Sequence, residues 1–323
     1  MYIKKEAADM NENCTNAIEI RNLTKNFGPK QALCGLNMTV PMGAIYGFIG
    51  ENGSGKSTTE KLLCGLFVPS GGQIRLFGRD YTDTDVRAKV GCLIEAPGCF
   101  QNYSVWNNLM LQAANLNLKK PEKEVAKVLK MVRMEGAASN KFKNCSLGMK
   151  QRIGIAMALL GDPALLVLDE PINGLDADGM RIMREVLVNI TRSYQCTVVI
   201  SSHILGELEK IATHYGIVRG GKMIQEMTAE ELDKGCRTYI ALQTGEMSRT
   251  KALLACKYSR VEEDESGYIR VYDGTAPEEI VTYLYENKIL VSEIRTDKIG
   301  LEEYYMDLMH ENGGTSSKRR EEG

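Results

Sequence analysis

The sequence contains no run of 18 or more apolar residues, and only three of its 323 residues are histidine. A helix that spans a bilayer needs about 20 mostly apolar residues, so we expect no membrane-spanning segment. The nine cysteines are scattered, form no Cys-x-x-Cys pair and have no histidine close by in the sequence. This pattern supports neither a disulfide framework nor a structural zinc site, and it predicts reduced thiols.

An excess of charge of one sign is also lacking. Forty Lys and Arg residues stand against 42 Asp and Glu residues, which gives a net charge of −2. The one dense basic run, Lys318–Arg320, is followed directly by two glutamates. This balance argues against a nucleic-acid partner. Because the first 16 residues contain no apolar stretch of the kind found in signal peptides, we expect a cytoplasmic protein.

The chain is long enough for two globular domains and carries enough apolar material for a sizeable core. Short apolar runs at 45–49, 165–168 and 197–200 alternate with helical patterns such as 179–194, which predicts an α/β fold around a parallel sheet. The stretch from Ser104 to 161 reads as largely helical, with Ser104 as an N-cap. Within it, Pro121 opens a helix that we expect to run to about Met134.

A change of pattern near residue 227 marks a second domain. Apolar segments at 239–242, 268–272 and 289–294 favour strands, 260–262 is a fourth candidate, and 248–256 and 277–287 favour helices. The resulting order, β-α-β-β-α-β, is that of a ferredoxin-like unit, and a last helix follows at 301–310. We therefore expect a tail at 1–16, a nucleotide-binding domain at 17–227, a small α+β accessory domain at 228–310 and a second tail at 311–323.

The strongest local pattern is a phosphate-binding loop. It follows the apolar strand 45–49, opens a helix at Thr58, and fits G-x-x-x-x-G-K-[ST] with Gly50, Glu51, Asn52, Gly53, Ser54, Gly55, Lys56 and Ser57. Glycines let successive N–H groups point at phosphate oxygens, and the helix N-terminus faces the same anion. Lys56 can reach the β- and γ-phosphates, and the Ser57 hydroxyl can bind Mg²⁺. The loop predicts a site for a nucleoside triphosphate.

A second apolar strand ends in two acids, Asp169 and Glu170. Ligands of open α/β sheets bind at the carboxyl ends of strands, so these acids are placed to meet phosphate and metal. Asp169 is the candidate Mg²⁺ ligand. Glu170 is the candidate general base for the attacking water.

Four segments at these intervals resemble the ATP-binding subunits of ABC transporters. They are residues 50–58, Ser146–Arg152, Leu168–Asp176 and Ser201–His203. The resemblance implies a P-loop ABC ATPase with a helical subdomain that binds ATP and Mg²⁺ between two subunits arranged head to tail. It assigns Ser146, Leu147 and Gly148 to the signature that contacts the ATP held by the partner subunit, although Cys145, Leu147 and Met149 depart from the common Leu-Ser-Gly-Gly-Gln form.

The same resemblance assigns roles to three further residues. It implies that His203 contacts the γ-phosphate and the water bound by Glu170, that Phe27 stacks on adenine, and that Asp176 acts across the dimer. A structural histidine, a core phenylalanine and a simple helix N-cap remain the respective alternatives.

Glu95 stands where most members of the family have glutamine. Its Ile-Glu-x-Pro setting and the Ser-Leu-Gly-Met-Lys-Gln-Arg run resemble the subgroup that exports bacitracin, lantibiotics and similar antimicrobial peptides. We expect Glu95 to be a Mg²⁺ ligand near Glu170, because a carboxylate is a harder ligand than an amide. A solvated loop glutamate is the alternative.

Taken with the residues, the resemblance implies an ATPase subunit of an exporter on the inner face of the cell membrane. Its partners would be a second ATPase subunit, forming a homodimer, and permease subunits on separate chains. The alternatives are an ABC ATPase that acts on DNA or ribosomes, and a non-ABC P-loop kinase or GTPase. A long coiled coil between P-loop and signature, typical of DNA-repair members, is absent, and the chain has one cassette where translation factors have two.

Overall fold

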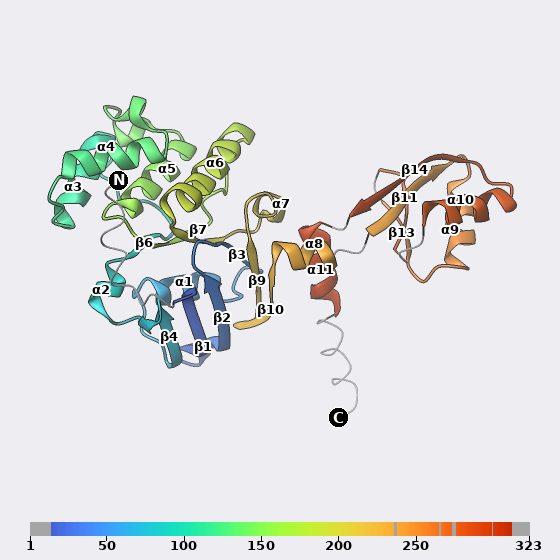
Figure 1. Cartoon of the computed structure of the whole chain (residues 1–323), viewed down its shortest axis with the longest axis horizontal. Coiled ribbons are helices and arrows are strands. Elements are labelled where there is room, and N and C mark those ends of the chain that lie inside the picture. The colour runs from blue at the N-terminus through green and yellow to red at the C-terminus, as the bar shows by residue number, and fades with distance from the viewer. Residues whose placement is uncertain (1–13, 236–237, 265, 273–275, 299, 312–323) are drawn as a thin grey trace. The chain divides into compact units, whose positions relative to one another are not determined.

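The computed structural model describes residues 14–235, 238–264, 266–272, 276–298 and 300–311. The chain forms two compact units that divide between Ala229 and Glu230 (Figure 1). A boundary after residue 227 would cut into strand β10, which runs from Lys222 to Thr228. Among the described residues, no helix combines the length and the apolar character that a membrane span requires.

The first unit is built on a six-stranded sheet that is parallel except for one edge strand. Its order is β10 (Lys222–Thr228), β9 (His214–Arg219), β3 (Ile45–Ile49), β8 (Thr197–Ser201), β7 (Leu165–Asp169) and β6 (Val90–Leu93). Every residue of β3 and β8 is buried, as the continuous apolar runs predicted. The strands predicted at 45–49, 165–168 and 197–200 are confirmed.

A second, antiparallel sheet completes the core of this unit. Its order is β2 (Lys30–Pro41), β1 (Asn16–Phe27), β4 (Gly71–Leu76) and β5 (Arg79–Asp80). The main hydrophobic cluster joins Ile18 and Leu36 of this sheet to Val167 and Val199 of the parallel sheet, with Leu62 of α1 between them in the same cluster. The buried leucines of α1 therefore anchor this helix in the core.

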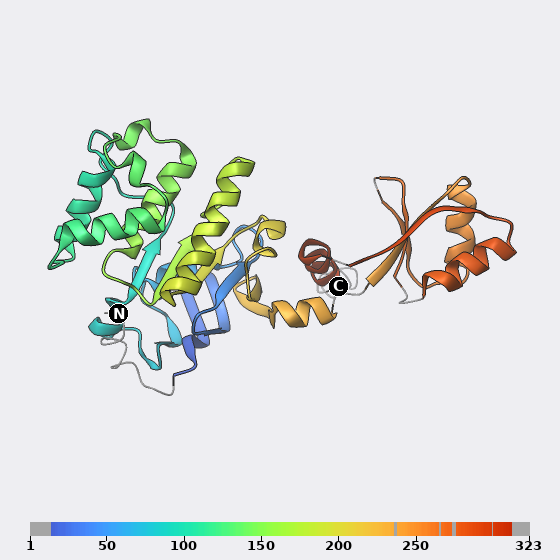
Figure 2. The same cartoon turned by 45° about the horizontal axis from the view of Figure 1, so that its top comes forward.

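The helices of the first unit are α1 (Lys56–Leu63), α2 (Thr84–Arg87), α3 (Val105–Asn115), α4 (Pro121–Met131), α5 (Leu147–Leu159), α6 (Ala177–Tyr194) and α7 (Leu205–Leu208). Helices α3, α4 and α5 pack on one another, and α5 also packs on β6 and β7 (Figure 1 and Figure 2). Ser104 caps α3 and Pro121 opens α4, as predicted. The expected end of α4 near Met134 is wrong, because the chain leaves the helix at Val132 and Arg133 has a left-handed φ of 56°.

The second unit contains an antiparallel sheet in the order β12 (Val261–Glu263), β13 (Ile269–Val271), β11 (Thr238–Thr244) and β14 (Val291–Lys298). Helices α9 (Met247–Ala255) and α10 (Pro277–Glu286) connect these strands, and their residues share a core with one face of the sheet. This is the β-α-β-β-α-β order and strand arrangement of a ferredoxin-like unit, as the sequence predicted. Two more helices, α8 (Ala229–Gly235) and α11 (Leu301–Glu311), flank it in the sequence.

Candidate nucleotide-binding site

Three neighbouring parallel strands, β3, β7 and β8, end at the same edge of the sheet. Their register pairs Ser201 of β8 with Asp169 of β7 and with Phe48 of β3. The phosphate-binding loop begins two residues after Phe48, and Glu170 directly follows Asp169. Segments more than 100 residues apart in the sequence therefore meet where α/β sheets bind their ligands.

The loop from Gly50 to Gly55 curls around the ammonium group of Lys56. The Nζ atom donates hydrogen bonds to the carbonyl oxygens of Gly50 (2.6 Å) and Glu51 (3.1 Å), and Lys56 is only 7% exposed. Gly55 has a φ of 113°, which side-chain-bearing residues rarely adopt. A Cβ atom at Gly50 would lie 2.4 Å from the carbonyl oxygen of Val218. The curl of the loop thus requires glycine at both ends.

Two polar side chains of this loop, Ser54 and Lys56, are buried without full compensation by the protein. The Ser54 hydroxyl is buried and has no hydrogen-bond partner within the described part of the chain. Burial lowers the pKa of Lys56, while the carboxylates of Glu170 and Glu60 act in the opposite direction. A buried cation and an unpaired hydroxyl at a helix N-terminus favour an anionic ligand. The loop therefore fits the phosphates of a nucleotide.

The two acids at the end of β7 are held by Ser201. Its hydroxyl donates to Asp169 Oδ1 at 3.0 Å and accepts from the backbone N–H of Glu170 at 3.1 Å. Glu170 has a φ of 50°, an uncommon conformation for a residue with a side chain. The Ser201 hydroxyl stabilises this turn and directs Asp169, a role that the sequence did not reveal except through its position in Ser-Ser-His.

His203 lies against the candidate base. Its Nδ1 atom is 2.7 Å from Glu170 Oε2, and the imidazole remains half exposed. This contact joins two residues that are 33 positions apart. It orients the Glu170 carboxylate and leaves one face of the histidine open to a ligand, and the role of each in catalysis stays a prediction.

The donor atoms at this edge fit a magnesium ion. The Ser57 hydroxyl and the Asp169 carboxylate are hard oxygen ligands of the kind that Mg²⁺ prefers. Within the described residues, no three His, Cys, Asp or Glu side chains form a group that could hold a metal by themselves. Magnesium commonly takes only one or two protein ligands and completes its shell with phosphate oxygens and water. The site therefore fits Mg²⁺ together with ATP rather than Mg²⁺ alone.

Glu60 is a buried acid that sequence reasoning missed. It lies on α1 one turn after Lys56 and is completely buried. Burial, followed by the neighbouring Asp169 carboxylate, raises the pKa of Glu60 to about 8. Neither carboxylate oxygen has a well-aligned hydrogen-bond partner among the described residues. The i, i+4 spacing from Lys56 was the available signal, because it places both side chains on one face of the helix.

Glu95 follows β6 and forms an ion pair with α1. Its carboxylate accepts a hydrogen bond from Lys61 Nζ on α1 at 2.9 Å, and its side chain is 73% exposed. Lys61 lowers the pKa of this carboxyl. The Glu95 carboxylate is therefore held, in this structure, in an exposed ion pair with the phosphate-loop helix. A metal-binding role for Glu95 stays a prediction.

Phe27 lies at the end of β1 and is 43% exposed, which differs from the core position that was its alternative. Its ring packs edge-on against Phe67 with 5.3 Å between centroids, and Lys25 Nζ lies 5.0 Å from the ring centre. One face of an exposed ring is suited to stacking on a base. The adenine contact itself stays a prediction.

The signature serine, Ser146, and Asp176 each cap the N-terminus of a helix. Ser146 Oγ accepts from the N–H of Met149 at the start of α5, and Asp176 Oδ1 accepts from the N–H of Gly179 at the start of α6. Leu147 is 49% exposed, and its Cδ2 would lie 3.0 Å from a Cβ atom at Gly174. Gly148 similarly faces Leu175. The starts of α5 and α6 therefore pack together, and the N-terminus of α5 is exposed to solvent.

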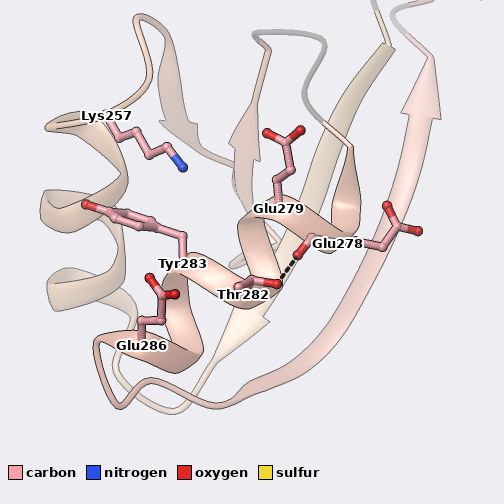
Figure 3. Close-up of a pocket in the computed structure, with 6 residues that line it drawn as sticks. All are labelled: Lys257, Glu278, Glu279, Thr282, Tyr283 and Glu286. Carbon is pink, nitrogen blue, oxygen red and sulfur yellow. Dashed lines mark hydrogen bonds between the residues drawn. The ribbon is translucent and has the colours of Figure 1, made fainter.

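The second unit contains a separate hollow of about 340 Å³ (Figure 3). Its lining residues come from α10 and the segment after α9, namely Lys257, Glu278, Glu279, Thr282, Tyr283 and Glu286. Lys257 Nζ lies 4.5 Å from the centre of the Tyr283 ring, and Thr282 Oγ1 donates to the Glu278 carbonyl. None of the predicted site residues lies in this hollow.

Comparison with known proteins agrees with the geometry. A family model described as "ABC transporter" matches residues 33–173. The bacitracin transport ATP-binding protein BcrA of Bacillus licheniformis is 36% identical over 303 residues, which cover 92% of this chain and 98% of the relative. The chain belongs to the ATP-binding proteins of ABC transporters. It is an ATPase whose hydrolysis of ATP serves transport.

Two further comparisons each match about two thirds of this ABC ATPase. The lantibiotic transport ATP-binding protein SrtF of Streptococcus pyogenes is 40% identical over 209 residues, which are 65% of this chain and 90% of the relative. Among solved structures, cbiO1 from Clostridium perfringens, part of the ABC transporter complex cbiONQ, has a TM-score of 0.63 at 26% identity over 68% of this chain and 91% of its own. The predicted family, fold class and ATPase activity are confirmed.

Proposed function

We propose that this ABC ATPase drives the export of an antimicrobial peptide of the bacitracin or lantibiotic type. The names of two relatives refer to transport of such peptides. BcrA, named for bacitracin, matches 92% of this chain, and SrtF, named for lantibiotics, matches 65% of it. The proposal includes a homodimer of this chain, permease subunits on separate chains, and a position on the cytoplasmic face of the membrane. The single observation that carries the ATP-driven step is the Ser201–Asp169–Glu170–His203 arrangement beside the phosphate loop.

Binding of ATP would begin with the phosphate loop. The Gly50 and Glu51 carbonyls now accept the hydrogen bonds of Lys56, and the β- and γ-phosphates would take their place. Exchange of neutral acceptors for anionic oxygens strengthens the interaction of a buried ammonium group. Ser57 and Asp169 would hold Mg²⁺, which when bound neutralises the charge that develops on the phosphate oxygens.

Hydrolysis would then depend on Glu170 and His203. Glu170 accepts a proton from water as the water oxygen attacks the γ-phosphorus, and the bond between that phosphorus and the ADP oxygen breaks. Glu170 then returns the proton to phosphate. His203 fixes the carboxylate through its 2.7 Å contact, so that the free oxygen of Glu170 faces the water.

The dimer would close over the nucleotide through the signature. The bond from Met149 N–H uses a lone pair of Ser146 Oγ rather than its hydrogen, so the hydroxyl can still donate to a phosphate. The N-terminus of the 13-residue helix α5 adds favourable electrostatics toward an anion. In a head-to-tail pair, each subunit would contribute its loop to one ATP and its signature to the other.

The proposal is tested in the cells that make this protein. Deletion of the gene for this chain should make the cells more sensitive to bacitracin or a lantibiotic, and expression of the wild-type chain should restore resistance. Lys56→Ala, which removes the phosphate-directed charge, should not restore it. If sensitivity to these peptides is unchanged while the purified chain hydrolyses ATP, peptide export is wrong and the ATPase assignment stands.

The partners are tested separately on the Glu170→Gln variant, which should bind ATP without hydrolysing it. Affinity purification from membranes should recover a polytopic membrane protein, and gel filtration with ATP should show a dimer that dissociates without nucleotide. A chain that stays monomeric under saturating ATP contradicts the dimer. Recovery of no membrane protein contradicts the permease partnership.

A further inference from the structure

Two cysteines of the first unit line the same surface hollow. Cys64 forms the C-cap of α1, and Cys92 lies in β6, three residues before Glu95. Both line a hollow of about 360 Å³ together with Arg87. Cys92 is exposed and Cys64 is half-buried, so a small reagent in solvent reaches the pair.

The two thiols are chemically unequal. Both side chains face the same hollow, and their interaction with each other is the main cause that lowers the pKa of Cys92 and raises the pKa of Cys64. Burial raises the pKa of Cys64 further. The exposed Cys92 sulfur is therefore the stronger candidate for a thiolate. A low-pKa exposed cysteine beside a second thiol is the arrangement found at oxidation-sensitive sites.

We propose that Cys64 and Cys92 form a reversible oxidation site, at which a peroxide converts the two thiols into a disulfide that joins α1 to β6. The Cys92 thiolate attacks one oxygen of hydrogen peroxide, a sulfur–oxygen bond forms, the oxygen–oxygen bond breaks, and the departing hydroxide takes a proton to become water. Cys64 then attacks the sulfenic acid of Cys92. The sulfur–sulfur bond forms, and the hydroxyl group leaves with the thiol proton as a second water.

The consequence for the ATPase follows from what the disulfide connects. Helix α1 begins with Lys56 and Ser57 of the phosphate loop, and β6 leads directly into Glu95. An exposed ion pair, Lys61–Glu95, already links these two segments. A disulfide, with its sulfur atoms about 2.05 Å apart, would add a covalent constraint between the same segments. We expect oxidation to slow ATP hydrolysis several-fold and reduction to restore it.

The cross-link is tested on the full-length protein by peroxide treatment, alkylation of remaining thiols, and peptide mapping without reductant. We expect a peptide pair joined through Cys64 and Cys92, which dithiothreitol separates. Cys64→Ser should leave Cys92 as a sulfenic acid that dimedone traps. Cys256→Ser is the matched control, because Cys256 is also exposed and lies in the second unit. If Cys64 and Cys92 stay free while peroxide oxidises Cys256, the proposal is wrong.

The regulatory part is tested by ATPase rates of the same samples. Cys92→Ser should hydrolyse ATP at the wild-type rate and lose its sensitivity to peroxide, whereas Cys256→Ser should keep that sensitivity. If the mapped disulfide forms and the rate is unchanged, the constraint on α1 does not limit turnover. Because the cross-link is measured by mass, this result is independent of which compound the transporter moves.

Discussion

Charged side chains of the two units differ in how far the protein itself compensates them. In the second unit, Arg260 donates two hydrogen bonds to Asp307, at 2.8 and 3.1 Å, and its guanidinium lies 4.2 Å from the centre of the Tyr272 ring. At the nucleotide site of the first unit, the buried Lys56 donates to two carbonyls of its own loop, and the buried Glu60 has no well-aligned partner within the part of the chain that the structure describes.

The pKa changes express the same contrast. The hydrogen bonds from Arg260 to Asp307 raise the pKa of this guanidinium, which means that its charged form is stabilised by the fold. Burial lowers the pKa of Lys56 and raises that of Glu60, so the charged forms of both are destabilised. Charges that are already paired contribute to folding, whereas charges that are buried without full compensation mark a place where a ligand is expected.

The largest effect that this comparison predicts is on catalysis. Glu170→Gln removes the proton acceptor but keeps an oxygen near His203, so ATP hydrolysis should fall by about 10²–10⁴-fold while ATP binding persists. Steady-state ATPase assays and nucleotide-binding titrations measure the two properties. Glu122→Gln on α4 is the matched control, because it makes the same change at an exposed position. A wild-type rate for Glu170→Gln would refute the base assignment.

The next effect is on stability and concerns Glu60. Its pKa is raised from an ordinary value of 4.5 to about 8, so the folded state retains a proton that the unfolded chain has lost. Stability should therefore fall as the pH rises from about 4.5 to 8, by roughly 5 kcal/mol for the full change in pKa. Glu60→Met should remove this dependence and stabilise the protein at pH 8.

Urea unfolding of the first unit at pH 5 and pH 8, with EDTA and without nucleotide, measures this difference. Glu122→Gln on α4 is the control, since Glu122 is exposed and its substitution should shift both midpoints equally. Equal stability differences between Glu60→Met and the wild type at the two pH values would mean that Glu60 is not a destabilised acid.

A smaller effect is expected for the paired charges of the second unit. Arg260→Met keeps the hydrocarbon stem but removes the bonds to Asp307 and the contact with Tyr272. Because the Arg260 side chain is 31% exposed, we expect a loss of only about 1–2 kcal/mol in the stability of this unit. Hydrogen exchange of β12 and β13 measures the loss. A double-mutant cycle with Asp307→Asn should show coupling, and additive effects would argue against the pair.

The smallest effect should come from removing the second unit altogether. The truncated chain should end after Ala229 rather than before Thr228. Thr228 of β10 pairs with His214 of β9, and the Ala229 N–H donates to the Thr213 carbonyl. All the nucleotide-site residues precede this point, so ATP affinity should change by less than about threefold, or 0.7 kcal/mol. Equilibrium titration with a fluorescent ATP analogue measures it. A large loss of affinity in the folded truncation would show that the second unit contributes to the site.

Much of the fold could be predicted because its signals are local. Continuous apolar runs identified the central strands, Ser104 was recognised as an N-cap from its position, and a helix N-cap was the alternative given for Asp176. The antiparallel sheet was not predicted from the sequence. Strands β1 and β2 are only partly buried and their register shifts at several points, which obscures the alternation of buried and exposed residues.

The sequence by itself determined which chemical groups this protein carries: the glycine-rich loop, two acids at a strand end, a histidine after Ser-Ser, and two cysteines 28 positions apart. Only the tertiary structure decided which of them meet. Parallel pairing of β7 with β8 brings Ser201 to Asp169 and His203 to Glu170. Packing of α1 against the sheet buries Glu60. The C-terminal end of α1 brings Cys64 to the hollow that Cys92 of β6 also lines. Such pairings depend on register between segments far apart in the chain, and no local pattern of residues specifies that register.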